Sequence, residues 1–382
     1  MNRRKFLKIA GSASIIIAAG GVGFVATRTP TEALKPWKTA GLLYTDPMRR
    51  ALSFAILAPN PHNRQPWIVD LKSDTEAVLT CDLERLLPDT DPFSRQIVIG
   101  LGCFLEMFTL AARDQGYLAD IQLFPQGMPG TKLDLRPIAH LKLNKQIGLI
   151  SDPLFAETLN RHTNREPYDT SRPIEDQKLQ HLIKATNTEV SAGATNGGKL
   201  LDDLRVLTKD AILTEIKTPK AFQESVDLMR IGKAEIEASP DGISLGGAFL
   251  EGLKLAGVLS RKSLADPSSQ SFQIGLDMNE ASAMSSMGFF WINTKGNSRT
   301  DQINVGRSYL RVALQATKDG LSMQPMSQAL QEYAAMDLYF KTIHDRLANK
   351  PGERMQMLAR LGYAEKVGPA PRWPLATRIK EA

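Results

Sequence analysis

Cysteine and histidine are scarce in this sequence of 382 residues, which holds two cysteines and five histidines. Two cysteines cannot form the framework of bridges that stabilises small secreted proteins. The sequence does not decide whether Cys81 and Cys103 form a single disulfide. Cys103 lies in an apolar stretch, where a free cysteine serves as a small core residue. The histidines show no ligand spacing, so we expect no metal centre. They are His62, His140, His162, His181 and His344.

Acidic residues are absent from the first 28 positions, and this explains the basic balance of the chain. Of the formal net charge of +6, five charges come from this segment and +1 is left for the remainder. A nucleic-acid surface would need an excess of basic residues in the folded part. The sequence therefore argues against a nucleic-acid partner. The five basic residues are Arg3, Arg4, Lys5, Lys8 and Arg28.

The basic segment resembles a bacterial twin-arginine export signal. The motif "RRKFLK" precedes an apolar run from Ile9 to Val25, and twin-arginine pairs before such runs direct export. The alternative is a basic start before a plain membrane anchor, since the run is just long enough to span a bilayer and no clear A-x-A cleavage site follows. We expect a periplasmic or exported protein that uses the twin-arginine translocase, with retention at the inner membrane if the signal is not cleaved.

Low-complexity tracts are absent too, and the remaining chain is long enough for two or three folded units. Asp46 is placed to cap a helix that Pro59 stops, and further Asp-Pro pairs predict a buried helix over 94–116 and a new unit near residue 151. Residues 200–267 are helical in pattern without strand signals, as in an inserted cover. The mixture predicts an α+β fold. Strands are expected in "WIVDLK", "AVLTCDL", "ADIQLF", "IAHLKLN" and "MGFFWINT".

An internal repeat is visible in two helical segments. Gly102 and Gly116 enclose one segment, and Gly306 and Gly320 enclose the other with the same separation. Glycine often ends a helix, so two ordinary helices with glycine caps are the alternative to a duplicated unit.

Several motifs resemble those of the nitroreductase superfamily of FMN-binding flavoproteins. The stretch "APNPHNRQPW" is similar to its "APS-x-x-N-x-QPW" loop, and the His62-Asn63 pair resembles the Acg-like subgroup, whose chains are two nitroreductase units in tandem. The resemblance covers residues 49–375 and implies two fused units, 29–150 and 151–382, after a signal segment of 1–28, with a helical insert at about 200–267. It also implies a monomer that acts as an internal pseudo-dimer. Three further segments agree in order: "RHTNREPY", "ALQATKDGLSMQPMSQAL" and "RLGYAEKVGPAPRWPL".

The resemblance implies one FMN site built from both halves. A loop containing Asn60, His62, Asn63 and Gln65 is expected to contact the flavin ring, and the Met323-Gln324 segment to offer a backbone N–H to flavin N5. Arg161, Thr163, Arg165 and Arg372 are expected at the phosphate, which favours forked cations. From the residues alone, a solvated helix end is the alternative for Arg161 and Arg165, and a charge on an extended tail for Arg372. No catalytic side chain is predicted, because flavin N5 carries the chemistry.

The sequence departs from the family pattern at two places. Ala51 stands where ordinary nitroreductases have a phosphate-binding serine, so the first pseudo-site is expected to be inactive and one FMN to bind per chain. Methionines and a glutamine stand beside the N5 position. The main expectation is an exported FMN-dependent oxidoreductase that reduces nitroaromatics, quinones or similar small-molecule acceptors. Because NAD(P)H is absent outside the cytoplasm, the alternatives are a non-catalytic FMN-binding protein and a structural protein that has lost FMN.

Overall fold

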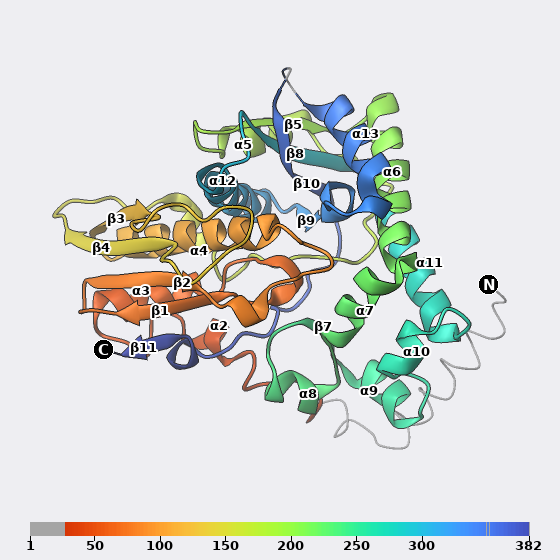
Figure 1. The fold of residues 1–382 in the computed structure, drawn as a ribbon, viewed down its shortest axis with the longest axis horizontal. Coiled ribbons are helices and arrows are strands. Elements are labelled where there is room, and N and C mark those ends of the chain that lie inside the picture. Colours follow the sequence, from red (N-terminus) through yellow and green to blue (C-terminus); the bar gives the residue numbers. More distant parts are fainter. Residues whose placement is uncertain (1–26, 349, 351, 382) are drawn as a thin grey trace.

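The computed structural model describes residues 27–348, 350 and 352–381, so the expected export signal lies almost wholly outside the described residues. Helices and strands mix along the chain, and they form a five-stranded sheet, a four-stranded sheet and a two-stranded ribbon. The α+β class predicted from the sequence is confirmed. Figure 1 shows the two larger sheets at the left and top of the view, with a group of short helices at the lower right.

The five-stranded sheet takes its last strand from the far end of the chain. Its order is β11-β1-β2-β4-β3, and all neighbours are antiparallel except β1 and β11. Helix α3 (Pro47–Ala55) begins as predicted, with the Asp46 side chain accepting from the Arg49 amide at 2.8 Å. The four predicted strands of this half are confirmed as β1 (Trp67–Leu71), β2 (Glu76–Cys81), β3 (Tyr117–Leu123) and β4 (Ala139–Lys145), joined by β11 (Ile379–Glu381).

The four-stranded sheet belongs to the second part of the chain and has the order β5-β8-β10-β9. Every residue of β8 is buried, as its continuous apolar sequence predicts. The helices that pack on this sheet include α6, α12 and α13. The elements are α5 (Asp176–Lys184), β5 (Ser191–Thr195), α6 (Gly198–Lys217), β8 (Gly288–Thr294), α12 (Arg299–Lys318), β9 (Ser322–Pro325), α13 (Asp337–Leu347) and β10 (Arg354–Gly362).

Two long helices join the halves where their glycines meet. Helix α4 (Arg95–Asp114) packs on α12, and the Gly102 and Gly306 Cα atoms face each other at the crossing. A Cβ on Gly306 would lie 2.0 Å from the Ile99 carbonyl oxygen, so only glycine permits this approach. Gly116 and Gly320 both follow their helices with φ above +70°. The four glycines thus occupy matching places, and the tandem origin of the halves stays a prediction.

The helical insert differs from the expectation in extent and content. Helix α6 packs on the second sheet and is core, so the insert comprises residues 218–269. It contains a parallel pair of three-residue strands, β6 and β7, which the sequence did not predict because such short strands show no periodicity. Its elements are α7 (Pro219–Asp227), β6 (Met229–Ile231), α8 (Lys233–Ala238), β7 (Ile243–Leu245), α9 (Ala248–Leu255) and α10 (Arg261–Ala265), before α11 (Gln270–Met284) returns to the core.

Helix α4 also corrects a detail of the sequence prediction. It begins at Arg95 after a left-handed Ser94, rather than at the Asp91-Pro92 pair, and the Asp91 carboxylate instead accepts from the Ile97 amide at 2.9 Å. Among the described residues it is the one helix long and apolar enough to cross a membrane, yet 89% of its apolar window is buried in the protein. Cys81 and Cys103 are both buried and free, which settles the open question of a disulfide.

Candidate functional site

The loop that follows α3 has an unusual backbone. We call residues 58–67 the opening loop. Three of its residues that are not glycine adopt positive φ: His62 at 47°, Asn63 at 52° and Gln65 at 51°. Such conformations cost free energy and persist only when surrounding contacts impose them, most often at functional sites. The sequence explains part of this, since asparagine tolerates the left-handed region better than most residues.

The amide side chains of the opening loop are used inside the protein. The Asn60 carbonyl oxygen accepts from the Gln65 backbone N–H at 2.7 Å. Gln65 is fully buried; its amide nitrogen donates to the Pro240 carbonyl at 2.7 Å, and its amide oxygen accepts from the Trp373 backbone N–H at 2.9 Å. Asn60 thus shapes the loop from within, whereas Gln65 ties it to the insert and to the tail. In this conformation both side chains are used by the protein, unlike the expectation that they contact a flavin ring.

Arg372 also has a different role from the one predicted. All five of its N–H groups are occupied: it donates to the carbonyls of residues 56, 57, 58 and 371 and to the Asn63 side-chain oxygen at 2.5 Å. The Asn63 amide nitrogen in turn donates to the Pro371 carbonyl at 3.0 Å. Burial, with a smaller contribution from Arg161, lowers the pKa of Arg372 to about 9. Arg372 and Asn63 therefore clamp the opening loop to the tail, and no donor of Arg372 is left for a phosphate.

Arg161 lies beside this clamp but is only partly satisfied. It is buried, and its Nη2 donates to the Leu57 carbonyl at 3.2 Å, while its Nε is buried without a partner among the described residues. Burial lowers its pKa, and no carboxylate acts on it. His162 follows, with its Nδ1 2.9 Å from the Val367 carbonyl and its pKa lowered to about 4 by burial and by Arg161. A buried cation with an unmatched donor is typical of a site for an anion.

Arg165 and Thr163 supply further unmatched donors. The Arg165 side chain is exposed and has no hydrogen bond or ion pair with any described residue, and the Thr163 hydroxyl is likewise unpaired there. Surrounding protein nevertheless lowers the pKa of Arg165 by desolvation. The pKa of His62 is lowered to about 4, mainly by burial. The positive charges of Arg165 and Arg64 add to this lowering. The Arg165 guanidinium therefore lies close enough to His62 of the opening loop to act on it, and a shared flavin site stays a prediction.

Strand β9 brings the Met323-Gln324 segment to the same region. The Met323 carbonyl accepts from the Asn164 amide at 3.2 Å, so its own N–H also points to the edge of β9 that β10 leaves free, because both groups of one strand residue point to the same side. The Gln324 side-chain oxygen accepts from the buried Arg360 at 2.7 Å. The Met323 N–H is thus on the free side of β9, and its role as a donor to flavin N5 stays a prediction. The Gln324 side-chain oxygen is occupied.

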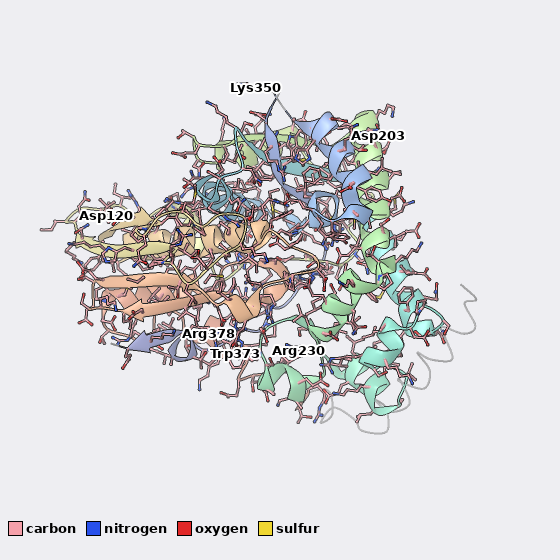
Figure 2. All side chains as sticks on the ribbon, in the orientation of Figure 1. Asp120, Asp203, Arg230, Lys350, Trp373 and Arg378 are labelled. Carbon is pink, nitrogen blue, oxygen red and sulfur yellow. The ribbon has the colours of Figure 1, made fainter. Side chains whose placement is uncertain are left out.

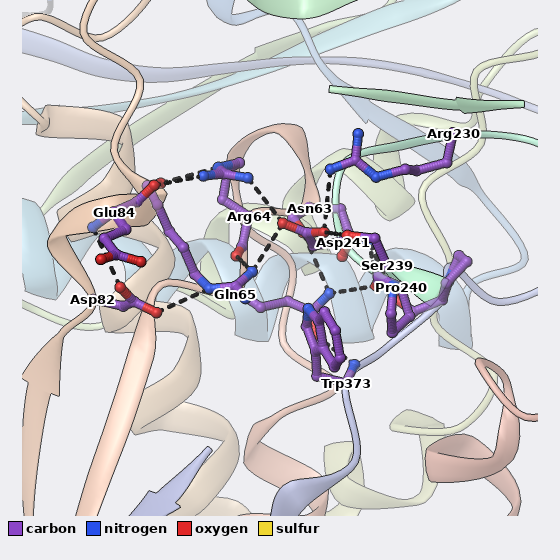
Figure 3. A network of polar contacts seen from close by, with 12 residues as sticks. Asn63, Arg64, Gln65, Asp82, Glu84, Arg230, Ser239, Pro240, Asp241 and Trp373 are labelled. Atoms are coloured by element: carbon purple, nitrogen blue, oxygen red, sulfur yellow. Dashed lines mark hydrogen bonds and ion pairs between the residues drawn. The ribbon is translucent and has the colours of Figure 1, made fainter. Parts of the chain in front are cut away.

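The insert is fastened to the opening loop by an ionic cluster shown in Figure 3. The buried Asp241 carboxylate accepts from Arg64 and Arg85 at 2.8 Å each and from Arg230 at 3.4 Å. Burial opposes ionisation, but the Ser239 hydroxyl and the three arginines hold the pKa of Asp241 below its usual range. The sequence did not reveal Asp241, because its two nearest guanidinium partners, Arg64 and Arg85, lie more than 150 positions away.

The corresponding cation of the first half is neutralised. Arg49 pairs with Asp46 at 3.4 Å and with Glu381 at 3.1 Å, and Ala51 beside it is fully buried. An arginine that already holds carboxylates has less charge to offer an anion. The unmatched donors are thus concentrated around residues 161–165.

No family model matches the sequence. Comparison with individual proteins nevertheless finds relatives that are named as nitroreductases. The chain is 23% identical over 340 residues to the "Putative NAD(P)H nitroreductase acg" of Mycobacterium tuberculosis, covering 86% of this chain and 93% of that protein. It is 26% identical over 211 residues to the "Probable NAD(P)H nitroreductase PigM" of a Serratia species, covering 53% of this chain and 56% of that protein. This chain thus aligns with about half the length of PigM.

Solved structures give a more distant similarity. A nitroreductase structure from Anabaena variabilis has 11% identity, covers 76% of this chain and 69% of that one, and gives a TM-score of 0.37. The FMN-dependent nitroreductase NfnB of Mycobacterium smegmatis has 14% identity, covers 58% and 95%, and gives a TM-score of 0.35. These scores are too low to establish a shared arrangement. The similarity that spans the chain is therefore the one in sequence, to proteins named as nitroreductases.

Proposed function

We propose that this protein is an FMN-dependent oxidoreductase of the nitroreductase type. The observation that carries the proposal is the set of unmatched donors at residues 161–165, which lies without any paired carboxylate beside the free edge of β9. A phosphate dianion suits guanidinium and hydroxyl donors. These residues therefore fit the phosphate of FMN, and the similarity to proteins named as NAD(P)H nitroreductases supports the same reaction class.

Each part of the site has a defined task in this proposal. Arg161, Thr163 and Arg165 bind the phosphate, and the Met323 N–H is the donor for the flavin ring. Arg372 and Asn63 hold the opening loop in its strained form, so that little ordering remains to be done on binding. Bound FMN would supply two-electron transfer from a donor to a nitroaromatic, a quinone or a similar acceptor.

The insert favours a second candidate function, a non-catalytic FMN-binding protein. Several contacts fix the insert over the opening loop: Asp241 binds Arg64, Ser225 binds His62, and the Gly242 amide donates to the Asn63 carbonyl at 3.2 Å. The Gln65–Pro240 hydrogen bond adds to them. A cover held this firmly restricts the approach of a bulky nicotinamide. Export through the twin-arginine pathway, which we also propose from "RRKFLK", would remove NAD(P)H as a donor altogether.

The test begins with the absorption spectrum of the purified protein and its FMN content. We expect about one FMN per chain, and a flavin-free protein would contradict the proposal. Arg165→Gln should weaken FMN binding roughly 10- to 100-fold, because it removes one charge-assisted contact with the phosphate. Arg50→Gln is the matched control, since Arg50 is also exposed and has no side-chain partner among the described residues.

Reduction of the bound flavin then separates the two candidate functions. In the oxidoreductase, NADPH or a reduced quinone bleaches the flavin absorption, and an added quinone such as menadione restores it. In a protein that only binds FMN, dithionite bleaches the flavin but neither biological donor does so.

A further inference from the structure

A buried arginine connects the segments that form the proposed site. The Arg360 side chain of β10 is fully buried. Its Nε donates to the Gln324 side-chain oxygen of β9 at 2.7 Å, and its Nη2 donates to the Glu166 carbonyl at 2.8 Å. Its Nη1 donates to the Ser282 carbonyl at 2.8 Å. Arg360 thus holds together strand β9, the chain just after the 161–165 segment and the last turns of α11.

The charge of Arg360 is not neutralised by a carboxylate. Its hydrogen bonds all go to neutral oxygens, and it takes part in no ion pair among the described residues. Its guanidinium carbon lies 3.8 Å from the centre of the Tyr168 ring, which adds a cation–π contact. Arginine stays protonated in proteins, and a buried charge is screened less than an exposed one. A full positive charge therefore lies beside β9.

The bond to Arg360 determines which way the Gln324 amide faces. A guanidinium has only donors, so the atom that faces it is the amide oxygen and the NH₂ group faces away. Gln324 is half-buried, and its amide nitrogen has no partner among the described residues. This nitrogen is also not one of their buried unpaired atoms. It therefore reaches the surface with its protons available to a ligand.

The free amide lies next to the groups that we propose for FMN binding. Gln324 follows Met323, and the Asn164 N–H donates to the Met323 carbonyl at the free edge of β9. Glu166 and Gln324 bind the same guanidinium, so the chain that carries the proposed phosphate donors passes directly beside the amide. The carbonyl oxygens of a flavin ring are acceptors, which suits an NH₂ donor at this place.

We infer that Gln324 donates to a carbonyl oxygen of the bound flavin ring, and that Arg360 is a positioning residue that acts through it. The inference rests on the proposed FMN-dependent function and deepens it. Arg360 orients the Gln324 amide, and its charge would stabilise the negative charge that a flavin gains on reduction. A glutamate in place of Gln324 would cancel the charge of Arg360, so the neutral side chain is part of the arrangement.

The first experiment measures FMN binding to Gln324→Glu by titration of the flavin-free protein. Glutamate keeps an acceptor for Arg360 and strengthens that contact, so the fold is preserved. It replaces the outward donor by an acceptor, and we expect FMN binding to weaken roughly 10- to 100-fold. Gln273→Glu is the matched control and should bind as wild type does, because Gln273 is exposed near the start of α11.

A purely structural role for Gln324 predicts the opposite result. If Gln324 only satisfies Arg360, glutamate does so better, and Gln324→Glu should bind FMN as tightly as wild type while it resists urea at least as well. Wild-type affinity in Gln324→Glu would therefore overturn the inference and leave the proposed function intact. A wild-type protein that binds no FMN would contradict the proposed function itself.

The second experiment measures the reduction potential of the bound flavin against a dye, with protein in excess over FMN. At the potential where wild type is half reduced, the ratio of reduced to oxidised flavin should fall roughly 10-fold in Gln324→Glu, which is about 30 mV for a two-electron couple. Arg360→Lys keeps the charge and should stay close to the wild-type ratio, as should Gln273→Glu. An unchanged ratio in Gln324→Glu, or an equal fall in Arg360→Lys, would overturn the role inferred for the Arg360 charge.

Discussion

Two arginines meet at the end of α3 without a carboxylate between them, and they differ in how their charge is accommodated. Both Arg161 and Arg372 donate to the Leu57 carbonyl. Burying a guanidinium is costly unless its donors are matched. Arg372 meets this condition with five protein acceptors, whereas Arg161 keeps a buried Nε without one. Arg372 therefore stabilises the loop, and Arg161 keeps a donor for the phosphate that we propose.

Glu215 should make the free energy of unfolding depend on pH. Burial raises the pKa of Glu215 to about 7, so the folded protein holds its proton up to that pH, whereas an unfolded glutamate loses it at about pH 4.3. The contribution is therefore fully present below the unfolded pKa and is lost as pH rises to the folded pKa. Over this window the loss amounts to about 3 kcal/mol. Glu215→Gln has no such dependence, so its stability relative to wild type should rise by that amount.

Urea unfolding at about pH 4.5 and about pH 7.5 checks this difference. His62 works in the opposite direction: its folded pKa is lowered to about 4, so its contribution is present above the unfolded pKa of about 6.5 and is lost as pH falls. Comparing the two proteins at each pH cancels this term. A constant stability difference between wild type and Glu215→Gln would show that Glu215 is ionised in the folded state.

Residue types were easier to predict than residue roles. The motifs placed Arg161, Arg165 and Met323 at one site, and the structure brings these segments together. Sequence reasoning could not assign Arg372 to the opening loop, because its acceptors are main-chain carbonyls whose positions depend on the loop conformation. Glu215 and Ser225 could not be identified for a similar reason. Ser225 bonds to His62 and Glu215 bonds to Gln331, and both partners are distant in the sequence.

At the scale of elements, the crossing of α4 and α12 decides whether the halves can pack. Gly306→Ala would place a Cβ 2.0 Å from the Ile99 carbonyl oxygen and 2.8 Å from the Cys103 amide nitrogen. Both are backbone atoms of a buried helix, so the helices must separate. We expect a loss of stability of more than about 4 kcal/mol, or failure to fold.

Gly275→Ala is the control for this substitution, measured by the same thermal or urea unfolding. Gly275 lies inside α11, and a Cβ there would meet nothing within 4 Å. Alanine is the better helix former, so this change should stabilise the protein by about 1 kcal/mol. Equal effects of the two substitutions would mean that the helices do not cross at Gly306.

Regular elements were predictable where periodicity and capping agreed. The buried strand β8, the paired strands β1 and β2, and the glycine after α12 all follow from local sequence. The structure of the insert was not predictable from local sequence. Its two strands have three residues each, and contacts such as the Asp241 cluster hold them in place. The expected boundary at residue 200 was wrong for the same reason: α6 has an insert-like sequence but packs on the sheet.

At the scale of the whole molecule, the tail of the second half completes the first half. It passes the opening loop at residues 371–373 and ends in β11 on the first sheet. The Trp373 ring lies 5.6 Å from the Arg85 guanidinium and 5.5 Å from that of Arg378, and Figure 2 shows Trp373 and Arg378 side by side with Arg230 of the insert nearby. The tail, the insert and the first half therefore meet at one place. Loss of any of them should disturb the conformation of the opening loop.

Two truncations of the tail separate its roles. Removing residues 379–382 deletes β11, which frees one edge of β1 and breaks the pair between Arg49 and Glu381. This should cost about 1–3 kcal/mol of unfolding free energy, the range for a few backbone hydrogen bonds, and leave FMN content unchanged.

Removing residues 371–382 also deletes Arg372 and leaves the carbonyls of residues 56–58 without that donor. The opening loop then loses what holds its positive φ values, so the protein should lose FMN as well as stability. Urea unfolding and FMN content of both forms decide the matter: if the longer truncation retains FMN as well as the shorter one, the tail only closes the sheet and the clamp has no part in the site.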